Sequence, residues 1–70
     1  MRTSARNQLP GVIRGIKLGG VMAQVDVAVG EHEVTAVITR QSAEELGLQE
    51  GDNVYVIVKA TEVMVGKDES

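Results

Sequence analysis

Two short segments near the two ends of the chain carry the side chains with the clearest chemistry. Residues 4–7 (Ser-Ala-Arg-Asn) bring a hydroxyl, a guanidinium and a carboxamide, and residues 59–61 (Lys-Ala-Thr) add an ammonium and a second hydroxyl. A deprotonated tetrahedral oxyanion only accepts hydrogen bonds, so it is best held by N–H and O–H donors with one or two cations. The segments supply this chemistry if they meet in space. Otherwise residues 4–7 are a frayed terminus and Lys59 is a surface charge at a strand end.

The remaining residues give little support for catalysis or for metal binding. The 70 residues include no cysteine and a single histidine, His32, so disulfides and thiolate metal sites are excluded and zinc lacks ligands. A nucleophile needs an adjacent base, and His32 is expected to be an exposed strand residue beside a turn. No glycine-rich phosphate-loop motif is present. We therefore expect a binding protein and not an enzyme.

Charge is distributed unevenly along the chain, whose net charge is −3. Residues 1–20 carry four basic residues and no acid, whereas residues 21–70 carry three basic against ten acidic residues. Domains that bind duplex DNA usually have an excess of basic residues, because phosphate contacts supply much of their affinity. The acidic balance therefore argues against nucleic acid as a partner. An anion would have to be held by a few placed donors.

Alternating apolar residues predict a small β protein. Residues 22–29 and 32–40 each place apolar side chains on one face, and the Gly30-Glu31 turn between them indicates an antiparallel hairpin. A bent strand is expected before the hairpin, ending in a Gly19-Gly20 turn, because proline and glycine interrupt its apolar run. The predicted strands cover residues 6–18, 22–29, 32–40, 53–60 and 62–65.

One short helix is predicted between the third and fourth strands. Ser42-Ala-Glu-Glu45 matches a capping box, with Ser42 as the N-cap, Leu46 as the buried residue and Gly47 just past the end. The resulting order of elements is typical of an all-β, five-stranded OB-like Greek-key barrel with one short helix. We expect residues 1–70 to form a single domain with a frayed tail over residues 65–70.

A core of this size provides limited stability, which points to an oligomer. A chain of 70 residues supplies only about 3–5 kcal/mol from its own core. The strand over residues 53–60 is apolar on both faces, with Tyr55 and Ile57 opposite its valines. A neighbouring subunit is a natural cover for one of these faces, and a central strand covered on both sides within a monomer is the alternative. No apolar run is long enough to span a membrane, and no secretory signal is visible. A cytoplasmic location without a membrane partner is therefore expected.

Several motifs are shared with one known family. They are SARNQL at 4–9, Gly11, IKLG at 16–19, TAVI at 35–38, SAEELG at 42–47, Gly51 and VKAT at 58–61 followed by Val63-Met64. With these motifs the chain resembles, over about residues 3–65, the molbindins, which are small cytoplasmic molybdate- and tungstate-binding proteins built from one Mop-type (TOBE) domain. The resemblance implies an OB-like barrel, a homo-hexamer arranged as a trimer of dimers, and oxyanions bound at subunit interfaces.

The resemblance also implies which residues bind. Carried over residue by residue, the main oxyanion site falls on Ser4, Ala5, Arg6, Lys59, Ala60 and Thr61. Some relatives have serine at position 60, so Ala60 leaves only its backbone N–H there. A second class of site, near the threefold axis, is assigned to Gly19, Gly20 and Val21. Molybdate or tungstate is then a bound ligand and not a catalytic cofactor, held for storage or homeostasis.

Three alternative functions remain. Residues 38–58 also resemble the swapped-hairpin DNA-binding regulators of the AbrB type, which share a short helix, an L-G-L turn and a G-D before a strand. A single-stranded nucleic-acid module of the OB type would stack bases on aromatic side chains, and Tyr55 is the only aromatic residue here. A regulatory domain that binds an oxyanion to control a partner protein is compatible with the main interpretation.

Overall fold

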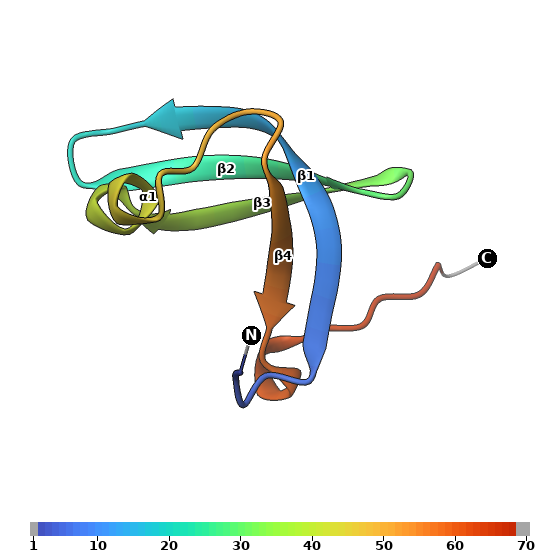
Figure 1. Ribbon diagram of the computed structural model, residues 1–70. Coiled ribbons are helices and arrows are strands. Elements are labelled where there is room, and N and C mark those ends of the chain that lie inside the picture. The colour runs from blue at the N-terminus through green and yellow to red at the C-terminus, as the bar shows by residue number, and fades with distance from the viewer. Residues whose placement is uncertain (1, 69–70) are drawn as a thin grey trace.

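The computed structural model describes residues 2–68 and, within them, one antiparallel sheet, one short α-helix and one 3₁₀ turn (Figure 1). The strands lie in the order β3-β2-β1-β4, so β3 and β4 are the edges of the sheet. In this part of the chain every helix is too short or too polar to cross a membrane. The elements are β1 (Asn7–Leu18), β2 (Met22–Val29), β3 (His32–Thr39), α1 (Arg40–Leu46), β4 (Asn53–Val58) and η1 (Ala60–Glu62).

The long strand β1 shapes the sheet because it pairs with different neighbours along its length. Residues 7–12 pair with β4, and residues 12–18, apart from Arg14, pair with β2. Arg14 is an extra residue in the register with β2, which makes a β-bulge just before Gly15. At Gly11 the strand passes so close to β2 that a Cβ atom would lie 2.6 Å from the carbonyl oxygen of Ala28. The prediction of a first strand bent at its glycines is confirmed.

The hydrophobic core lies on one face of this curved sheet. Ile13, Val25, Val27 and Val56 are buried and form one cluster, drawn from three strands. The predicted hairpin is confirmed, since β2 and β3 pair along their whole length and Gly30 turns between them with φ of 60°. The alternation along β2 is also as predicted, with its apolar residues toward the core.

The helix α1 begins earlier than the sequence predicts. Its N-cap is Thr39, whose Oγ1 accepts a hydrogen bond of 3.1 Å from the backbone N–H of Ser42. The prediction that Ser42 is the N-cap is therefore wrong. The chain leaves β3 directly into the helix, so the last residue of the strand occupies the capping position.

The far end of α1 is partly as predicted. Gly47 ends the helix in the left-handed conformation, with φ of 62°, and this prediction is confirmed. The predicted burial of Leu46 is wrong, because Leu46 is exposed and Ala43 is the buried residue of the helix. Leu48, just beyond the helix, packs against the core in its place.

Removing the observed cap is expected to cost more than removing the predicted one. We expect Thr39→Ala to lower the free energy of unfolding by about 1 kcal/mol, because the N–H of Ser42 then loses its acceptor. Ser42→Ala should change it by less than about 0.5 kcal/mol, since it removes only the exposed bond of 2.8 Å that Thr39 Oγ1 donates to Ser42 Oγ and leaves the capping bond to the Ser42 N–H in place. Urea unfolding followed by circular dichroism measures both values. A larger loss for Ser42→Ala would contradict the assignment.

The sheet is open, so the predicted closed five-stranded barrel is wrong, whereas a mostly β domain with one short helix is confirmed. The fourth strand ends at Val58 and the chain enters η1. Residues 62–65, predicted as a fifth strand, pair with no described strand and run away from the sheet (Figure 1). A barrel closes only when both edge strands find partners. Of the predicted frayed tail, residues 69–70 lie outside the described residues.

Apolar side chains remain exposed on β4 and on the segment after η1. Tyr55 and Ile57 point away from the core and are 57% and 45% exposed, as expected for a strand that is apolar on both faces. Met64 and Val65 are 93% and 94% exposed. Within residues 2–68, no segment covers these side chains.

Candidate oxyanion-binding site

The two donor-bearing segments meet at one end of the sheet. Asn7 at the start of β1 pairs with Val58 at the end of β4, and its side-chain Nδ2 donates a hydrogen bond of 3.1 Å to the Val58 carbonyl oxygen. Arg6 and Lys59, the next residues outward, therefore leave the sheet side by side. Figure 1 shows the N-terminal segment and η1 next to each other at this end. The condition set by the sequence, that the segments meet in space, is fulfilled.

Short-range hydrogen bonds give each segment its local shape. Lys59 is extended, with φ of −67° and ψ of 134°, and its carbonyl oxygen accepts a bond of 2.8 Å from the N–H of Glu62, which closes η1. On the N-terminal side, the N–H of Ala5 donates to Thr3 Oγ1 at 3.2 Å, and Gln8 Nε2 donates to the Ala5 carbonyl oxygen at 3.2 Å. The Ala5 amide is thus already engaged within the chain.

The side chains of the predicted main site are available to a ligand. Ser4, Arg6, Lys59 and Thr61 are exposed, and within residues 2–68 none of these side chains takes part in a hydrogen bond or ion pair. Two hydroxyls, a guanidinium and an ammonium therefore lie at one end of the sheet without competing acceptors from the described chain. Such a set of donors, two of them positively charged, suits an anion.

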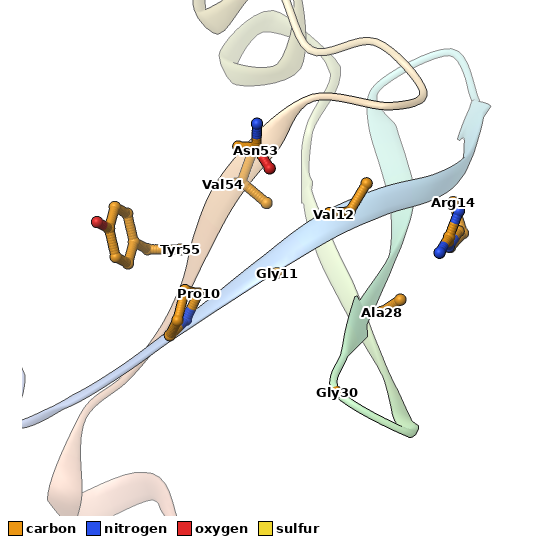
Figure 2. Close-up of a pocket in the computed structure, with 9 residues that line it drawn as sticks. All are labelled: Pro10, Gly11, Val12, Arg14, Ala28, Gly30, Asn53, Val54 and Tyr55. Carbon is orange, nitrogen blue, oxygen red and sulfur yellow. The ribbon is translucent and has the colours of Figure 1, made fainter.

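These residues form an open surface and not an enclosed pocket. A groove of about 370 Å³ lies elsewhere, between the bent part of β1 and β4. Figure 2 shows Tyr55 and Arg14 at opposite ends of this groove, so their side chains do not converge on a common ligand. Neither this groove nor a second one of about 600 Å³ beside α1 is lined by residues 4–6 or 59–61. In a single chain, the predicted main site is therefore incomplete.

The residues of the predicted second site lie far from the first. Gly19, Gly20 and Val21 form the turn between β1 and β2, at the opposite end of β1 from Arg6 (Figure 1). The N–H of Gly19 donates to the Met22 carbonyl oxygen at 2.7 Å, which closes the predicted turn. The structure thus keeps the two predicted sets of residues apart.

Sequence reasoning missed Arg40, which contacts this turn. Its spacing of four from Glu44 on a helix predicts an ion pair, and the Arg40 Nε to Glu44 Oε1 distance is 2.7 Å. Its bond to the Gly19 carbonyl oxygen, by contrast, has no sequence signal because 21 residues separate the two. No group of three His, Cys, Asp or Glu side chains within the described residues could hold a metal ion.

Comparisons with known proteins agree with this fold. The TOBE domain family matches residues 3–65. Molybdenum-pterin-binding protein 2 of Clostridium pasteurianum is 44% identical over 66 residues, which is 93% of this chain and 97% of that protein. The solved structure of a molybdate-binding protein from Sporomusa ovata superimposes with a TM-score of 0.91 at 40% identity, covering 96% of this chain and 100% of that chain.

Two further relatives are longer than this chain. The cytoplasmic molybdate-binding protein ModG, solved with molybdate bound, superimposes with a TM-score of 0.79 at 38% identity over 86% of this chain and 43% of that chain. The molybdenum transport protein ModE of Azotobacter vinelandii is 44% identical over 71 residues. This chain spans 26% of its length.

The chain is a small, open β domain with exposed anion donors, and its described residues include no cluster that could hold a metal ion. Together with the binding proteins that it matches, this places it in the class of small ligand-binding modules. More narrowly, the chain belongs to the TOBE domain family and, within it, to the molybdenum-pterin- and molybdate-binding proteins known as molbindins. These are binding proteins and not enzymes.

Proposed function

We propose that this chain binds molybdate or tungstate at interfaces between its own copies, as a cytoplasmic store that buffers the oxyanion. The observation that carries the proposal is the pairing of Asn7 with Val58, which brings the chain next to residues 4–6 and the chain next to residues 59–61 to the same end of the sheet. The molybdate-bound relative, which matches 86% of this chain, supports the choice of ligand. The single domain expected over residues 1–70 is the unit that assembles.

The donors present match the needs of a tetrahedral dianion. Arg6 and Lys59 offset its charge, and the hydroxyls of Ser4 and Thr61 donate to its oxygens. Backbone N–H groups of Ser4, Ala5 and Ala60 complete the set, with the Ala5 amide exchanging its bond to Thr3 Oγ1 for one to the ligand. Each oxygen needs a donor, since an unpaired polar atom in a desolvated site costs about 1–3 kcal/mol.

A second copy of the chain is the part that the single chain lacks. The donor surface is open to solvent, and a second subunit laid over it would exclude water and strengthen the charged hydrogen bonds. Exposed Tyr55, Ile57, Met64 and Val65 offer the apolar area for such an assembly. A hexamer built as a trimer of dimers is the arrangement we propose, with a second class of site at the turn of residues 19–21.

The donor chemistry also accounts for selectivity. Phosphate near neutral pH carries a proton and brings a donor into a site made of donors, so it is disfavoured. Sulfate is a smaller tetrahedron than molybdate, so it leaves some donors in a fixed cavity without contact. Molybdate and tungstate share shape and charge, and both suit the site.

Isothermal titration with sodium molybdate, on protein sized by light scattering, tests the proposal directly. We expect tight molybdate binding by an oligomer, with sulfate giving no heat under the same conditions. The stoichiometry then gives the number of sites per subunit. A well-folded oligomer that gives no heat with either anion would rule out the proposed function, and a monomer that binds molybdate as tightly would rule out the interface.

A further inference from the structure

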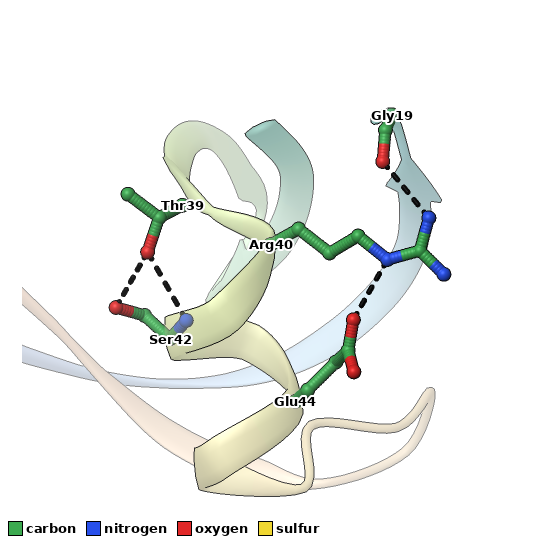
Figure 3. Close-up of polar contacts among 5 residues, drawn as sticks. All are labelled: Gly19, Thr39, Arg40, Ser42 and Glu44. Atoms are coloured by element: carbon green, nitrogen blue, oxygen red, sulfur yellow. Dashed lines mark hydrogen bonds and ion pairs between the residues drawn. The ribbon is translucent and has the colours of Figure 1, made fainter. Parts of the chain in front are cut away.

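The turn between β1 and β2 is held from outside by one residue, Arg40. The backbone N–H of Arg40 donates to the Val21 carbonyl oxygen at 2.7 Å, and its side-chain Nη1 donates to the Gly19 carbonyl oxygen at 3.0 Å. Figure 3 shows the guanidinium between this carbonyl and Glu44, which accepts from Nε at 2.7 Å. The carbonyl oxygens on both sides of Gly20 are thus fixed by the first residue of α1.

The same turn presents backbone donors that the described chain does not use. The N–H groups of Gly20 and Val21 donate to no acceptor within residues 2–68, and the Val21 side chain is 75% exposed. A Cβ added at Gly20 would meet nothing within 4 Å, and the φ of Gly20 is not in the left-handed region. The space beside Gly20 is therefore open to another molecule.

The charges beside the turn limit how an anion could be bound there. The adjoining groove of about 600 Å³ is lined by the turn and by Arg40, Glu44 and Glu45, so two carboxylates outweigh one guanidinium. Long-range attraction cannot hold an anion in such a place. Binding has to come from directed hydrogen bonds, and these require that the donors of a glycine-rich turn be ordered before the ligand arrives.

We propose that Arg40 is a positioning residue that orders the residues 19–21 turn as an oxyanion-binding element. The Gly19 carbonyl shares its peptide plane with the N–H of Gly20, and the Val21 carbonyl follows directly after the N–H of Val21, so tying down both carbonyls fixes the backbone on either side of these two donors. A guanidinium has five N–H donors, and two of them are used in the contacts described, so the remainder can also face an anion. The inference rests on the proposed function, because it concerns the second class of site for the same ligand.

The matched pair of variants Arg40→Met and Glu44→Gln separates positioning from general stability. Arg40→Met keeps the backbone bond to Val21 and loses the bond to Gly19, whereas Glu44→Gln removes the ion pair and leaves the Gly19 contact intact. Sodium molybdate is titrated calorimetrically into the wild-type oligomer and both variants, and also into Arg6→Ala, in which the turn sites remain. The backbone order parameters of the Gly20 and Val21 amides are measured by ¹⁵N NMR relaxation in the ligand-free proteins.

We expect two classes of site in the wild type. In Arg40→Met, the turn class should weaken about tenfold while the class that depends on Arg6 stays within twofold, and the order parameters of the two turn amides should fall. Glu44→Gln should retain both classes of site and the order parameters of the wild type. If Arg40→Met does not fold, Arg40→Lys, which keeps the charge but loses the planar fork, should show the same selective loss in a smaller degree.

Several results would overturn the inference. Unchanged binding and unchanged order parameters in Arg40→Met would do so, as would an equal loss in Glu44→Gln, which would make the ion pair responsible. A single class of site that Arg6→Ala removes completely would refute the turn site while leaving the proposed function standing. A wild-type protein silent to molybdate would refute both, so the two failures are told apart by the wild-type titration alone.

Discussion

Arg6→Ala is expected to weaken molybdate binding about 100-fold, equivalent to roughly 2.7 kcal/mol. Arg6 directly precedes Asn7 of the Asn7–Val58 pair, and its side chain has no competing partner within the described residues. Its removal deletes both a charge and a forked donor from a site that has to balance a dianion. Calorimetric titration of the variant, at the same protein concentration as the wild type, measures the change.

Arg14→Ala is the matched control for this loss. Arg14 is also an exposed arginine of the same N-terminal region, but it lies at the bulge of β1, several residues from the Asn7–Val58 pair. Arg14→Ala and Arg6→Ala change the net charge by the same amount, so any effect of the overall electrostatic field on binding is the same in both variants. We expect molybdate affinity within twofold of the wild type. Equal losses in Arg14→Ala and Arg6→Ala would show that net charge, and not the proposed site, controls binding.

Gly11→Ala is expected to lower the free energy of unfolding by about 3 kcal/mol, a large part of the stability of a domain this small. The added Cβ would lie 2.6 Å from the Ala28 carbonyl oxygen and 2.7 Å from a methyl group of Val27. Both atoms belong to β2, which is paired on both sides, so the strand cannot move aside without breaking its ladders. Urea unfolding followed by circular dichroism measures the loss.

Gly15→Ala provides the comparison for this prediction. Its added Cβ would meet only Asp26 Oδ2, at 3.5 Å, which is an ordinary van der Waals distance. We expect a change of less than about 0.5 kcal/mol, or a slight gain from the reduced freedom of the unfolded chain. Both variants are measured at one protein concentration, because the stability of an oligomer depends on it. Similar stabilities of the two variants would contradict the close approach of β1 and β2 at Gly11.

Gly11 and Gly15 show the limit of what the local sequence can predict. Both interrupt the same apolar run, and from sequence both predict a bend in the first strand. The structure separates their roles: Gly15 follows a bulge, whereas Gly11 permits a close crossing of two strands. A crossing depends on the other strand, and no pattern within residues 6–18 reports where that strand lies.

The errors in the sequence-based fold have a similar origin. Ser42 and Thr39 are both competent N-caps three residues apart, and the end of β3 selects Thr39. Residues 62–65 have the composition of a strand, but a strand forms only where an edge accepts it, and the sheet within the described residues leaves them unpaired. Strand propensity therefore predicted a fifth strand that finds no partner in the described sheet.

The amino-acid sequence alone determined the mostly β class with one short helix, the hairpin of β2 and β3, the apolar character of both faces of β4, and the donor chemistry of residues 4–6 and 59–61. These are properties of neighbouring residues, since strand periodicity, turns and side-chain donors are local. The tertiary structure alone decided that Asn7 and Val58, 51 residues apart, pair and bring the donors together. It also decided that Arg40 reaches the turn at Gly19. Such meetings depend on strand register and on the curvature of β1, which arise from the packing of the whole sheet.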